Sequence, residues 1–585
     1  MYILGISAYF HDSAAALLKD GVIIAAMQEE RFSRVKHDKS FPLLSIHNCL
    51  ETSGISIEQV NYIVFFEKPF WKFERIVSSI IDSIPNSFNL FTTALPLWLT
   101  RRLNIKFEIQ QKLGIKKEIL FADHHMAHAA SAYYNSRFDQ AAVLILDGVG
   151  EFATTSIGIA SGIEIKITKQ IQFPHSLGLL YSAFTQYCGF KVNSGEYKLM
   201  GLAPLGSPKY TSIIYDNLIH VNADGSFQLN MVYFDFSEGK TMINKRFCEL
   251  FNQHARIPES EITPFYCDIA ASIQSVIESI AITLLQITKE MTGLNNIVFA
   301  GGVFQNCRMN QILAEQELFE NHFFYPIPGD AGAAVGAAFL GYHVFLKNYK
   351  RVHQGSTIYL GNNLNTGKKY SSVKDTLEKL AVPYTLIEDN FIKTAQLLSE
   401  GKIVAWADGA MEFGARALGH RSILADPRSP DMKNKLNEKI KLRENFRPFA
   451  PVILDIYASS FFTMHNANYD SMMVTATALP GTKLIMPSVV HADGSSRIQV
   501  LSDQNNPTLY RLLSEFYTIT RCPALINTSF NIRGEPIVSS LINCLHTFIY
   551  SEIDVLVLDS KYMIIKTFDL EFLKNQISPY AYPLD

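Results

Sequence analysis

The sequence predicts an α/β protein whose N-terminal part is built from two like halves. Strand-type apolar runs joined by a tight turn occupy residues 2–29, and the same scheme returns at residues 142–172. The Asp20-Gly21 turn of the first copy and the Ser161-Gly162 turn of the second are offset by 141 residues. An internal duplication of a strand–hairpin unit followed by helices predicts two α/β halves that face each other across a cleft.

Two such halves are the layout of the actin-like (ASKHA, ribonuclease H-like) ATPases, in which ligands lie at the strand ends between the halves. By this analogy we expect an N-terminal domain over residues 1–350, with its second half starting near residue 140. Residues 351–365 are polar and turn-rich, which predicts a linker. Residues 366–585 return to helix–strand alternation, which predicts a second α/β domain.

The composition is that of a globular protein, with 48% hydrophobic and 18% charged residues. A formal net charge of −3 gives no electrostatic reason to expect a nucleic-acid partner. The seven cysteines show no C-x-x-C spacing, which fits reduced thiols in a cytoplasmic protein. The N-terminus lacks the basic region of a signal peptide, and the apolar run from Phe88 to Thr100 is short and broken by Pro96, so we expect no membrane segment.

A candidate metal site starts in the helix-like run that follows residue 123. His124 and His128 are four residues apart, so both imidazoles lie on one helical face and can point to one centre. The metalloprotease pattern H-E-x-x-H has the same spacing, but His125 stands where that pattern has its general-base Glu. Histidines that bind no ligand are the alternative for this spacing alone.

Two carboxylates extend the histidine pair. Asp147 follows the buried run AAVLIL, and Asp330 follows FFYPIPG and precedes a helix rich in Ala and Gly. Two imidazoles and two carboxylates form an N₂O₂ set that suits one zinc or iron ion better than calcium. Close helix–sheet packing is the alternative explanation for the Ala/Gly run.

Three further stretches of the N-terminal domain carry candidate residues. His11, in the first turn, can act as a general base on a hydroxyl because an imidazole titrates near neutral pH; a mobile loop is the alternative. Glu196 and Lys198 lie between small residues in SGEYKLMGLAP, which is either a nucleotide contact or a tight turn. The strand NNIVFA leads to Gly301-Gly302 and Asn306, a strand–glycine–helix pattern that suits phosphate binding.

The C-terminal domain is dense in arginine between residues 416 and 447. Guanidinium groups bind phosphates and carboxylates in bidentate geometry, and the apolar and proline residues between them indicate a folded pocket and not a nucleic-acid surface. Amides and hydroxyls after the run PALI complete a predicted triphosphate site, with an ordinary strand-ending turn as the alternative. The candidate anion-binding residues are Arg416, Arg421, Lys441, Arg443, Arg447, Asn527, Ser529 and Asn531.

Ten motifs follow one another along nearly the whole chain. They are GISAYFHDSAA, EERFSRVKHDKSFP, HHMAHAASAYY, LDGVGE, GEYKLMGLAP, GGVFQN, PGDAGAAVGAA, MEFGARALGHRSILADPR, KLRENFRPFAP and NTSFNIRGEPIV. In this order they resemble the NodU/CmcH family of O-carbamoyltransferases.

The resemblance implies a two-part enzyme that transfers a one-carbon group. A YrdC-like C-terminal domain would join ATP, with Mg²⁺, and carbamoyl phosphate into carbamoyl-adenylate and pyrophosphate at the anion-binding residues named above. The actin-like N-terminal domain would bind the adenylate, with one divalent ion, iron or zinc, held by the N₂O₂ set. His11 would then serve as the base in the transfer of the carbamoyl group to a hydroxyl of a small natural product or sugar.

The chain departs from the family pattern at two positions. Ala410 and Ala415 stand where relatives often carry Arg and Pro, so we expect a looser turn before Arg416 and one phosphate contact fewer. An enzyme of tRNA threonylcarbamoyl-adenosine synthesis and a non-catalytic nucleotide- or metal-binding relative remain as alternatives. The identity of the acceptor and the oligomeric state, a homodimer among the options, stay open.

Overall fold

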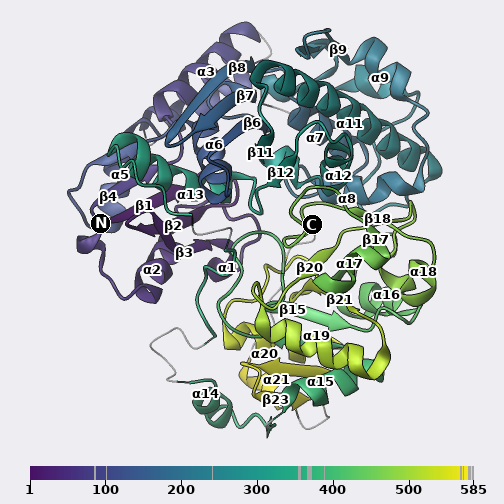
Figure 1. Ribbon diagram of the computed structural model, residues 1–585. Coiled ribbons are helices and arrows are strands. Elements are labelled where there is room, and N and C mark those ends of the chain that lie inside the picture. The colour runs from purple at the N-terminus through teal and green to yellow at the C-terminus, as the bar shows by residue number, and fades with distance from the viewer. Residues whose placement is uncertain are drawn as a thin grey trace. The chain divides into compact units, whose positions relative to one another are not determined.

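The computed structural model describes residues 1–84, 87–100, 102–239, 241–353, 357–364, 372–387, 389–566, 570, 572–577 and 582. The chain divides into two compact units (Figure 1). The first unit comprises Met1–Glu29 and Lys39–Ser356, and the second comprises Glu30–Asp38 and Thr357–Asp585. The division near residue 356 falls within the expected linker 351–365, of which residues 354–356 and 365 lie outside the described part.

The first unit contains two five-stranded sheets. The strands of the first sheet are β1 (Tyr2–Ser7), β2 (Ala14–Lys19), β3 (Val22–Gln28), β4 (Tyr62–Phe65) and β5 (Ile119–Phe121). Those of the second are β6 (Gln140–Leu146), β7 (Ala153–Ser161), β8 (Glu164–Gln172), β11 (Asn296–Ala300) and β12 (Asn321–Phe324).

The two sheets have the same topology. The strand order of the first sheet is β3-β2-β1-β4-β5. Read from the matching edge, the order of the second is β8-β7-β6-β11-β12, so that β6 corresponds to β1 and β11 to β4. In each sheet the first strand pairs antiparallel with the following hairpin strand and parallel with a later strand, β4 or β11. The predicted internal duplication is therefore confirmed.

The β2–β3 hairpin turns where the Asp-Gly step predicts. Asp20 and Gly21 have φ angles of 51° and 84°. Two successive positive φ angles are typical of the tight turns whose twist matches that of the flanking strands. The local sequence therefore determines this register.

Helices α6 (His124–Asn135) and α13 (Asp330–Leu340) pack side by side in the first unit (Figure 1). A Cβ atom at Gly336 of α13 would lie only 1.7 Å from the carbonyl oxygen of Ala127 in α6. A Cβ atom at Gly5 of β1 would lie 1.9 Å from the carbonyl oxygen of Ala334. Because only small residues permit this approach, the Ala/Gly run fixes α13 between β1 and α6.

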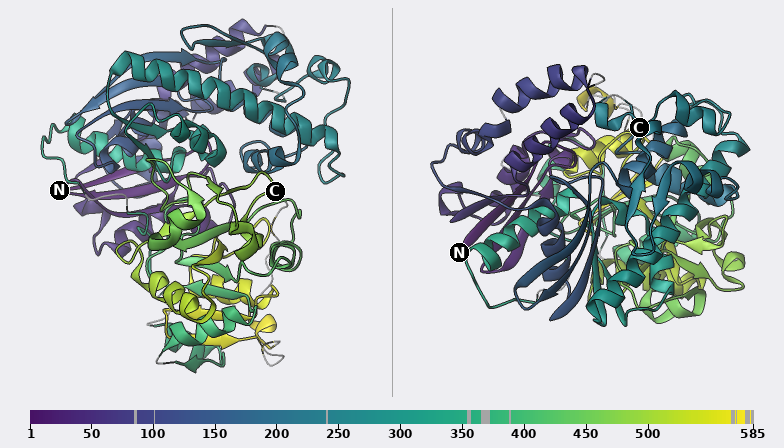
Figure 2. Two further views of the ribbon diagram at one scale, coloured as in Figure 1. Left: turned by 45° about the vertical axis from the view of Figure 1, so that its right-hand side comes forward. Right: turned by 90° about the horizontal axis from the view of Figure 1, so that it is seen from above.

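The remaining helices of the first unit flank the sheets. The longer ones are α2 (Leu43–Thr52), α3 (Pro69–Asp82), α4 (Phe88–Thr100), α5 (Ile105–Leu113), α7 (Leu177–Tyr187), α8 (Glu196–Leu202), α9 (Thr211–Asn217), α11 (Pro264–Thr292) and α12 (Cys307–Glu315). Among the described residues, α11, the long teal helix of Figure 2, has the length and hydropathy to cross a membrane. Because 67% of its most apolar window is buried, α11 is packed as a core helix.

The second unit is built on an eight-stranded mixed sheet with the order β13-β23-β22-β14-β15-β21-β16-β20. Its strands are β13 (Thr385–Leu386), β14 (Val404–Ala407), β15 (Arg421–Ala425), β16 (Ala450–Leu454), β20 (Gln499–Leu501), β21 (Ala524–Ser529), β22 (Val555–Leu558) and β23 (Tyr562–Ile565). Helices α15 (Asn390–Ser399) and α19 (Pro507–Thr520) pack on each other and enclose a core around Trp406 and Phe516. Both units are therefore α/β structures, as the sequence predicts.

Candidate functional site

Three chain segments bring the N₂O₂ set together in the first unit. Strand β5 leads into α6, whose N-cap Asp123 accepts a hydrogen bond from the backbone N–H of Met126 at 3.0 Å. This cap starts the helix at His124 and places His128 one turn later on the same face. Asp147 directly follows β6, and Asp330 is the first residue of α13.

The four side chains converge on one point. His124 Nε2 lies 3.1 Å from His128 Nε2 and 3.3 Å from Asp147 Oδ2. Asp330 Oδ1 lies 3.6 Å from the Nε2 atom of each histidine. All four residues are buried, and their ligand atoms lie within 4.8 Å of one another.

This arrangement fits a tetrahedral metal ion. Metal–ligand bonds of about 2.0–2.1 Å at tetrahedral angles place neighbouring ligand atoms about 3.3 Å apart, close to the observed separations. Within the described part of the chain, Asp330 Oδ2 and the Nδ1 atoms of both histidines are buried and have no hydrogen-bond partner. Converging imidazole nitrogens and carboxylates in a buried site are stabilised by a shared cation.

The carboxylate of Asp147 is held in its ionised form. Burial opposes ionisation, but the hydrogen bond to His124 and the charges of His128 and His124 keep the pKa of Asp147 well below its ordinary value. The backbone N–H of Gly302 donates to Asp147 Oδ1 at 2.9 Å. Gly302, of the glycine pair after β11, therefore orients the carboxylate of a candidate metal ligand.

Glu151 supports the cluster by holding the backbone at His124. The sequence did not predict a role for this residue. Its two carboxylate oxygens accept from the backbone N–H of His124, each at 3.1 Å, and Oε1 also accepts from the N–H of Lys68 at 2.7 Å. Burial and the charge of Asp123 raise the pKa of Glu151 to about 7. Its only sequence signal is the motif LDGVGE, in which Glu151 ends a turn that begins at Asp147.

His11 lies in the first unit beside the carboxylates of the cluster. Its Nδ1 atom is 3.2 Å from Asp12 Oδ2. Burial disfavours the imidazolium, but Asp330 and Asp12 outweigh it and raise the pKa of His11 to about 10. A cation at the cluster would offset the charge of Asp330 and bring this pKa down towards neutrality.

His125, the third histidine of the run, has a different role. Its Nδ1 atom lies 2.7 Å from Ser156 Oγ, and burial lowers its pKa to about 3. It is a neutral core residue and is not one of the four residues of the candidate metal site.

The nucleotide candidates of the first unit occupy structured positions. Glu196, the first residue of α8, accepts from Ser182 Oγ at 2.7 Å and from the N–H of Asn193 at 2.9 Å. Lys198 is buried, 2% exposed, with its ammonium 5.9 Å from the ring centre of Phe190. These contacts do not test a role in nucleotide binding, which stays a prediction.

The glycine pair and Asn306 form a compact turn. Gly301 has a φ angle of 96°, and a Cβ atom there would lie 2.3 Å from the carbonyl oxygen of Leu146, so this position requires glycine. Asn306 caps α12 by accepting from the N–H of Met309 at 3.0 Å and exchanges hydrogen bonds with Gln274. Helix α12 thus begins next to the glycine turn, as the strand–glycine–helix pattern predicts.

In the second unit the structure brings two other predicted residues, Ser529 and Asn531, into contact with Lys441. The buried ammonium group donates to the side chains of Asn531 and Ser529 at 2.8 and 3.2 Å and to the carbonyls of both residues. Burial and the nearby charges of Arg443 and Arg447 hold the pKa of Lys441 well below its ordinary value. A phosphate group would relieve this cluster of like charges.

The other predicted residues of the second unit have varied surroundings. Arg443 donates to Asn437 at 2.7 Å, and Arg447 lies 3.5 Å from Glu444. Arg416 is partly exposed on the loop after Ala415.

The side chains of Arg421 and Asn527 form hydrogen bonds within the second unit. Arg421 is fully buried, and its guanidinium donates to the carbonyls of Asp408, Gly409, His420 and Asn362. The amide of Asn527 donates to Gln499 at 2.7 Å. These two side chains stabilise the segments that they contact, and their predicted role in phosphate binding stays a prediction.

Comparison with known proteins gives matches over most of the chain. Family models described as "Carbamoyltransferase N-terminus" and "Carbamoyltransferase C-terminus" match residues 2–339 and 395–566. Similar proteins include sll1178 of Synechocystis, 45% identical over 96% of both chains. Nodulation protein NolNO of Sinorhizobium fredii is 31% identical over 95% of this chain and 79% of its own.

Solved structures resemble the chain more distantly. Component A of (R)-2-hydroxyglutaryl-CoA dehydratase from Acidaminococcus fermentans is 16% identical, with a TM-score of 0.32, over 59% of this chain and 100% of its own. HypF of T. kodakarensis is 14% identical, with a TM-score of 0.31, over 60% of this chain and 48% of its own.

Proposed function

The chain belongs to the carbamoyltransferase family, and from this premise we propose that it is an ATP-dependent O-carbamoyltransferase that acts on a hydroxyl group of a small molecule. The single observation that carries the proposal furthest is the buried, convergent N₂O₂ set in the first unit. It is a site for a divalent ion, iron or zinc, next to an imidazole that can move a proton.

Activation is the first half of the proposed reaction and belongs to the second unit, as in a YrdC-like domain. Carbamoyl phosphate, ATP with Mg²⁺ and one water give carbamoyl-adenylate, phosphate and pyrophosphate. Lys441 supports this assignment because its buried ammonium, with Arg443 and Arg447 nearby, offers positive charge to phosphate oxygens. Ser529 and Asn531 orient that ammonium through their hydrogen bonds.

Transfer is the second half and belongs to the first unit. His11 removes the proton of the acceptor hydroxyl, the hydroxyl oxygen forms a bond to the carbamoyl carbon, and AMP leaves with the electrons of the broken bond. A divalent ion on the four ligands would offset the charge that grows on the leaving phosphate. Binding of the adenylate beside this buried cluster would limit its hydrolysis by water.

Pyrophosphate release without an acceptor tests the activation step. We expect the wild type to release pyrophosphate from ATP only when carbamoyl phosphate is present and Lys441→Ala to lose this release. Lys439→Ala is the matched control, because Lys439 lies two residues away but is 54% exposed and pairs with Glu552 on the surface. Absence of release from metal-replete wild type would refute the proposed activation.

His11→Ala separates transfer from activation. We expect this variant to keep carbamoyl phosphate-dependent pyrophosphate release and to lose carbamoylation of hydroxyl compounds. If it loses both activities to the same extent, the division of labour between the two units is wrong.

A further inference from the structure

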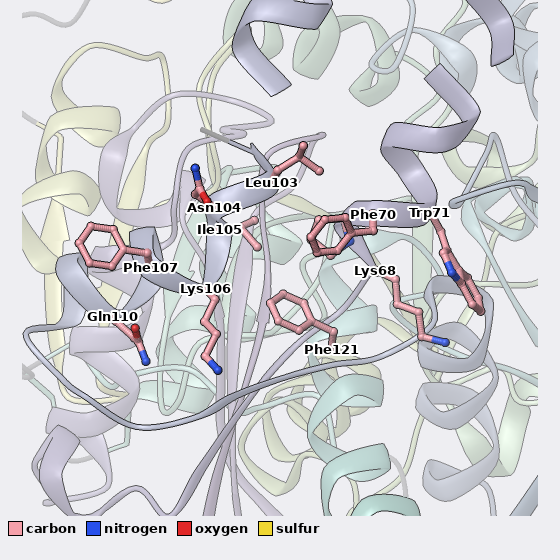
Figure 3. A pocket seen from close by; sticks show the side chains of 11 residues that line it. Lys68, Phe70, Trp71, Leu103, Asn104, Ile105, Lys106, Phe107, Gln110 and Phe121 are labelled. Carbon is pink, nitrogen blue, oxygen red and sulfur yellow. The ribbon is translucent and has the colours of Figure 1, made fainter. Parts of the chain in front are cut away.

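The first unit contains a cavity of about 550 Å³ beside the ends of β4 and β5 (Figure 3). Its walls come from the start of α3, from η2 (Arg102–Asn104), from α5 and from Phe121, the last residue of β5. Ligands in α/β proteins bind beyond the carboxyl ends of parallel strands, and β4 and β5 are parallel. The cavity is therefore at the edge of the sheet where binding sites form.

The lining of the cavity is mainly apolar and partly open to solvent. Its apolar side chains include those of Phe70, Trp71, Leu103, Ile105, Phe107 and Phe121. Phe70 and Phe107 are 68% and 66% exposed, which is unfavourable for rings in water. An apolar group that covers these rings removes their surface from water, which is favourable.

A few polar groups accompany the apolar surface. Lys68 and Lys106 lie at the cavity, and the Lys68 ammonium is 3.8 Å from the ring centre of Trp71. Small-molecule sites are typically about 300–1,000 Å³ in volume and combine apolar walls with a few polar groups. Size and lining are those of a site for a small amphipathic molecule.

The cavity is connected to the metal-ligand cluster by the segment that follows β4. The ring of Phe66 lies 5.2 Å from that of His124, centre to centre. Two residues later, Lys68 lines the cavity while its backbone N–H donates to Glu151, which also accepts from the N–H of His124. A molecule in the cavity therefore contacts the same short segment that supports the cluster.

We propose that this cavity binds the body of the carbamoyl acceptor and that the acceptor is a small hydroxyl compound carrying an aromatic or alkyl group. This inference rests on the proposed function, which it deepens by naming the substrate class. Continuity with the cluster through residues 66–68 favours a substrate over a second copy of the chain or a lipid surface as the occupant.

The test uses two glucosides that share a hydroxylated head, octyl β-D-glucoside below its micelle-forming concentration and methyl β-D-glucoside. Trp71 is the optical reporter, because it is 46% exposed at the cavity whereas Trp98 is only 8% exposed and Trp406 is fully buried. We expect the octyl compound alone to give a saturable blue shift of the full-length protein's tryptophan emission. Trp71→Phe should abolish the shift.

Two substitutions decide where the probe binds. Phe107→Ser should weaken octyl glucoside binding about tenfold or more by removing apolar contact. Leu484→Ser is the matched control, since Leu484 is 89% exposed in the second unit, and should bind as the wild type does. Equal binding of both glucosides, or unchanged binding by Phe107→Ser, would overturn the proposal. The proposal would also be overturned if the wild type, without glucoside, formed a dimer or bound to vesicles and Phe107→Ser abolished that association.

Pyrophosphate release, measured on the same wild-type preparation, separates this inference from the proposed function. Release without saturable octyl glucoside binding refutes the cavity proposal alone. Binding without release refutes the activation step, while the cavity remains a binding site for amphipathic hydroxyl compounds.

Discussion

Arg34 and Glu535 form a buried ion pair across 501 positions of the chain, with the guanidinium 2.8 Å from the carboxylate. Arg34 also donates to the carbonyls of Pro536 and Ile537, each at 2.8 Å. The carbonyl of Glu535 accepts from the side chain of Asn531, which in turn accepts from Lys441. A segment from the N-terminal region, Glu30–Asp38, thus belongs to the second unit and contacts its predicted anion-binding residues through this network.

Arg34→Ala should therefore damage activation from a distance. Glu535 is fully buried, so removal of its partner leaves an uncompensated charge and is expected to cost about 3–5 kcal/mol of unfolding free energy. Displacement of Asn531 should lower pyrophosphate release on the order of tenfold or more. Thermal unfolding and the release assay measure the two effects.

A second substitution separates this pair from general damage. Glu535→Gln in the Arg34→Ala background removes the unpaired charge and should recover part of the lost stability. Arg137→Ala, at an exposed position of the first unit, should behave as the wild type. If Arg34→Ala has the unfolding temperature and the pyrophosphate release of the wild type, the contacts from Arg34 through Glu535 and Asn531 do not position Lys441.

Metal content should depend on Asp330 more than on Glu151. Asp330→Asn removes one of the four ligands, whereas Glu151→Gln changes only the group that holds the backbone of His124. Loss of a supporting group typically lowers metal affinity about 10–100-fold, and loss of a ligand should lower it further.

Zn²⁺ and Fe²⁺ titrations with elemental analysis measure this order. His47→Ala is the control, because its side chain is 69% exposed and lies on α2. Full metal content in Asp330→Asn would show that the cluster is not the metal site.

The sequence was sufficient for those features that depend on local patterns or on repetition. The two turns offset by 141 residues predicted two equivalent sheets, and the Ala/Gly run allowed the close packing that brings Asp330 beside the histidines. Glu151 and Glu535 were not predicted as site residues, because each acts through backbone N–H groups or side chains that only the tertiary fold brings near. Nor can periodicity show that residues 30–38 belong to the second unit.

Gly336→Ala tests whether the close contact of α6 with α13 is required. The added methyl group would lie 1.7 Å from the carbonyl oxygen of Ala127, so the helices must separate. Overpacking of this kind typically costs about 1–3 kcal/mol, and the separation should also weaken metal binding because the two helices carry three of the four ligands.

Gly162→Ala is the comparison for this substitution. Its new methyl group meets nothing within 4 Å, and only the φ angle of 59° is unfavourable. It should lose about 1 kcal/mol and keep its metal. Equal metal affinity in both variants would show that the spacing of α6 and α13 does not set the geometry of the cluster.

Lys441 predicts a specific dependence of stability on pH. Burial, with Arg443 and Arg447, lowers the pKa of Lys441 in the folded protein below that in the unfolded chain. Between these two pKa values the unfolded state binds more protons, so this lysine makes the free energy of unfolding rise with pH. Below the folded pKa the folded protein is destabilised by the full cost of burying the charged lysine.

Replacement of Lys441 by Met removes this titration. The unfolding free energy of Lys441→Met minus that of the wild type should therefore fall as pH rises towards about 10.4, the ordinary pKa of lysine. Denaturant unfolding at a series of pH values measures this difference, with Lys439→Met as the exposed control. A difference that stays constant with pH would mean that the folded protein keeps Lys441 charged, with the hydrogen bonds that its ammonium donates to Ser529 and Asn531 stabilising the charge.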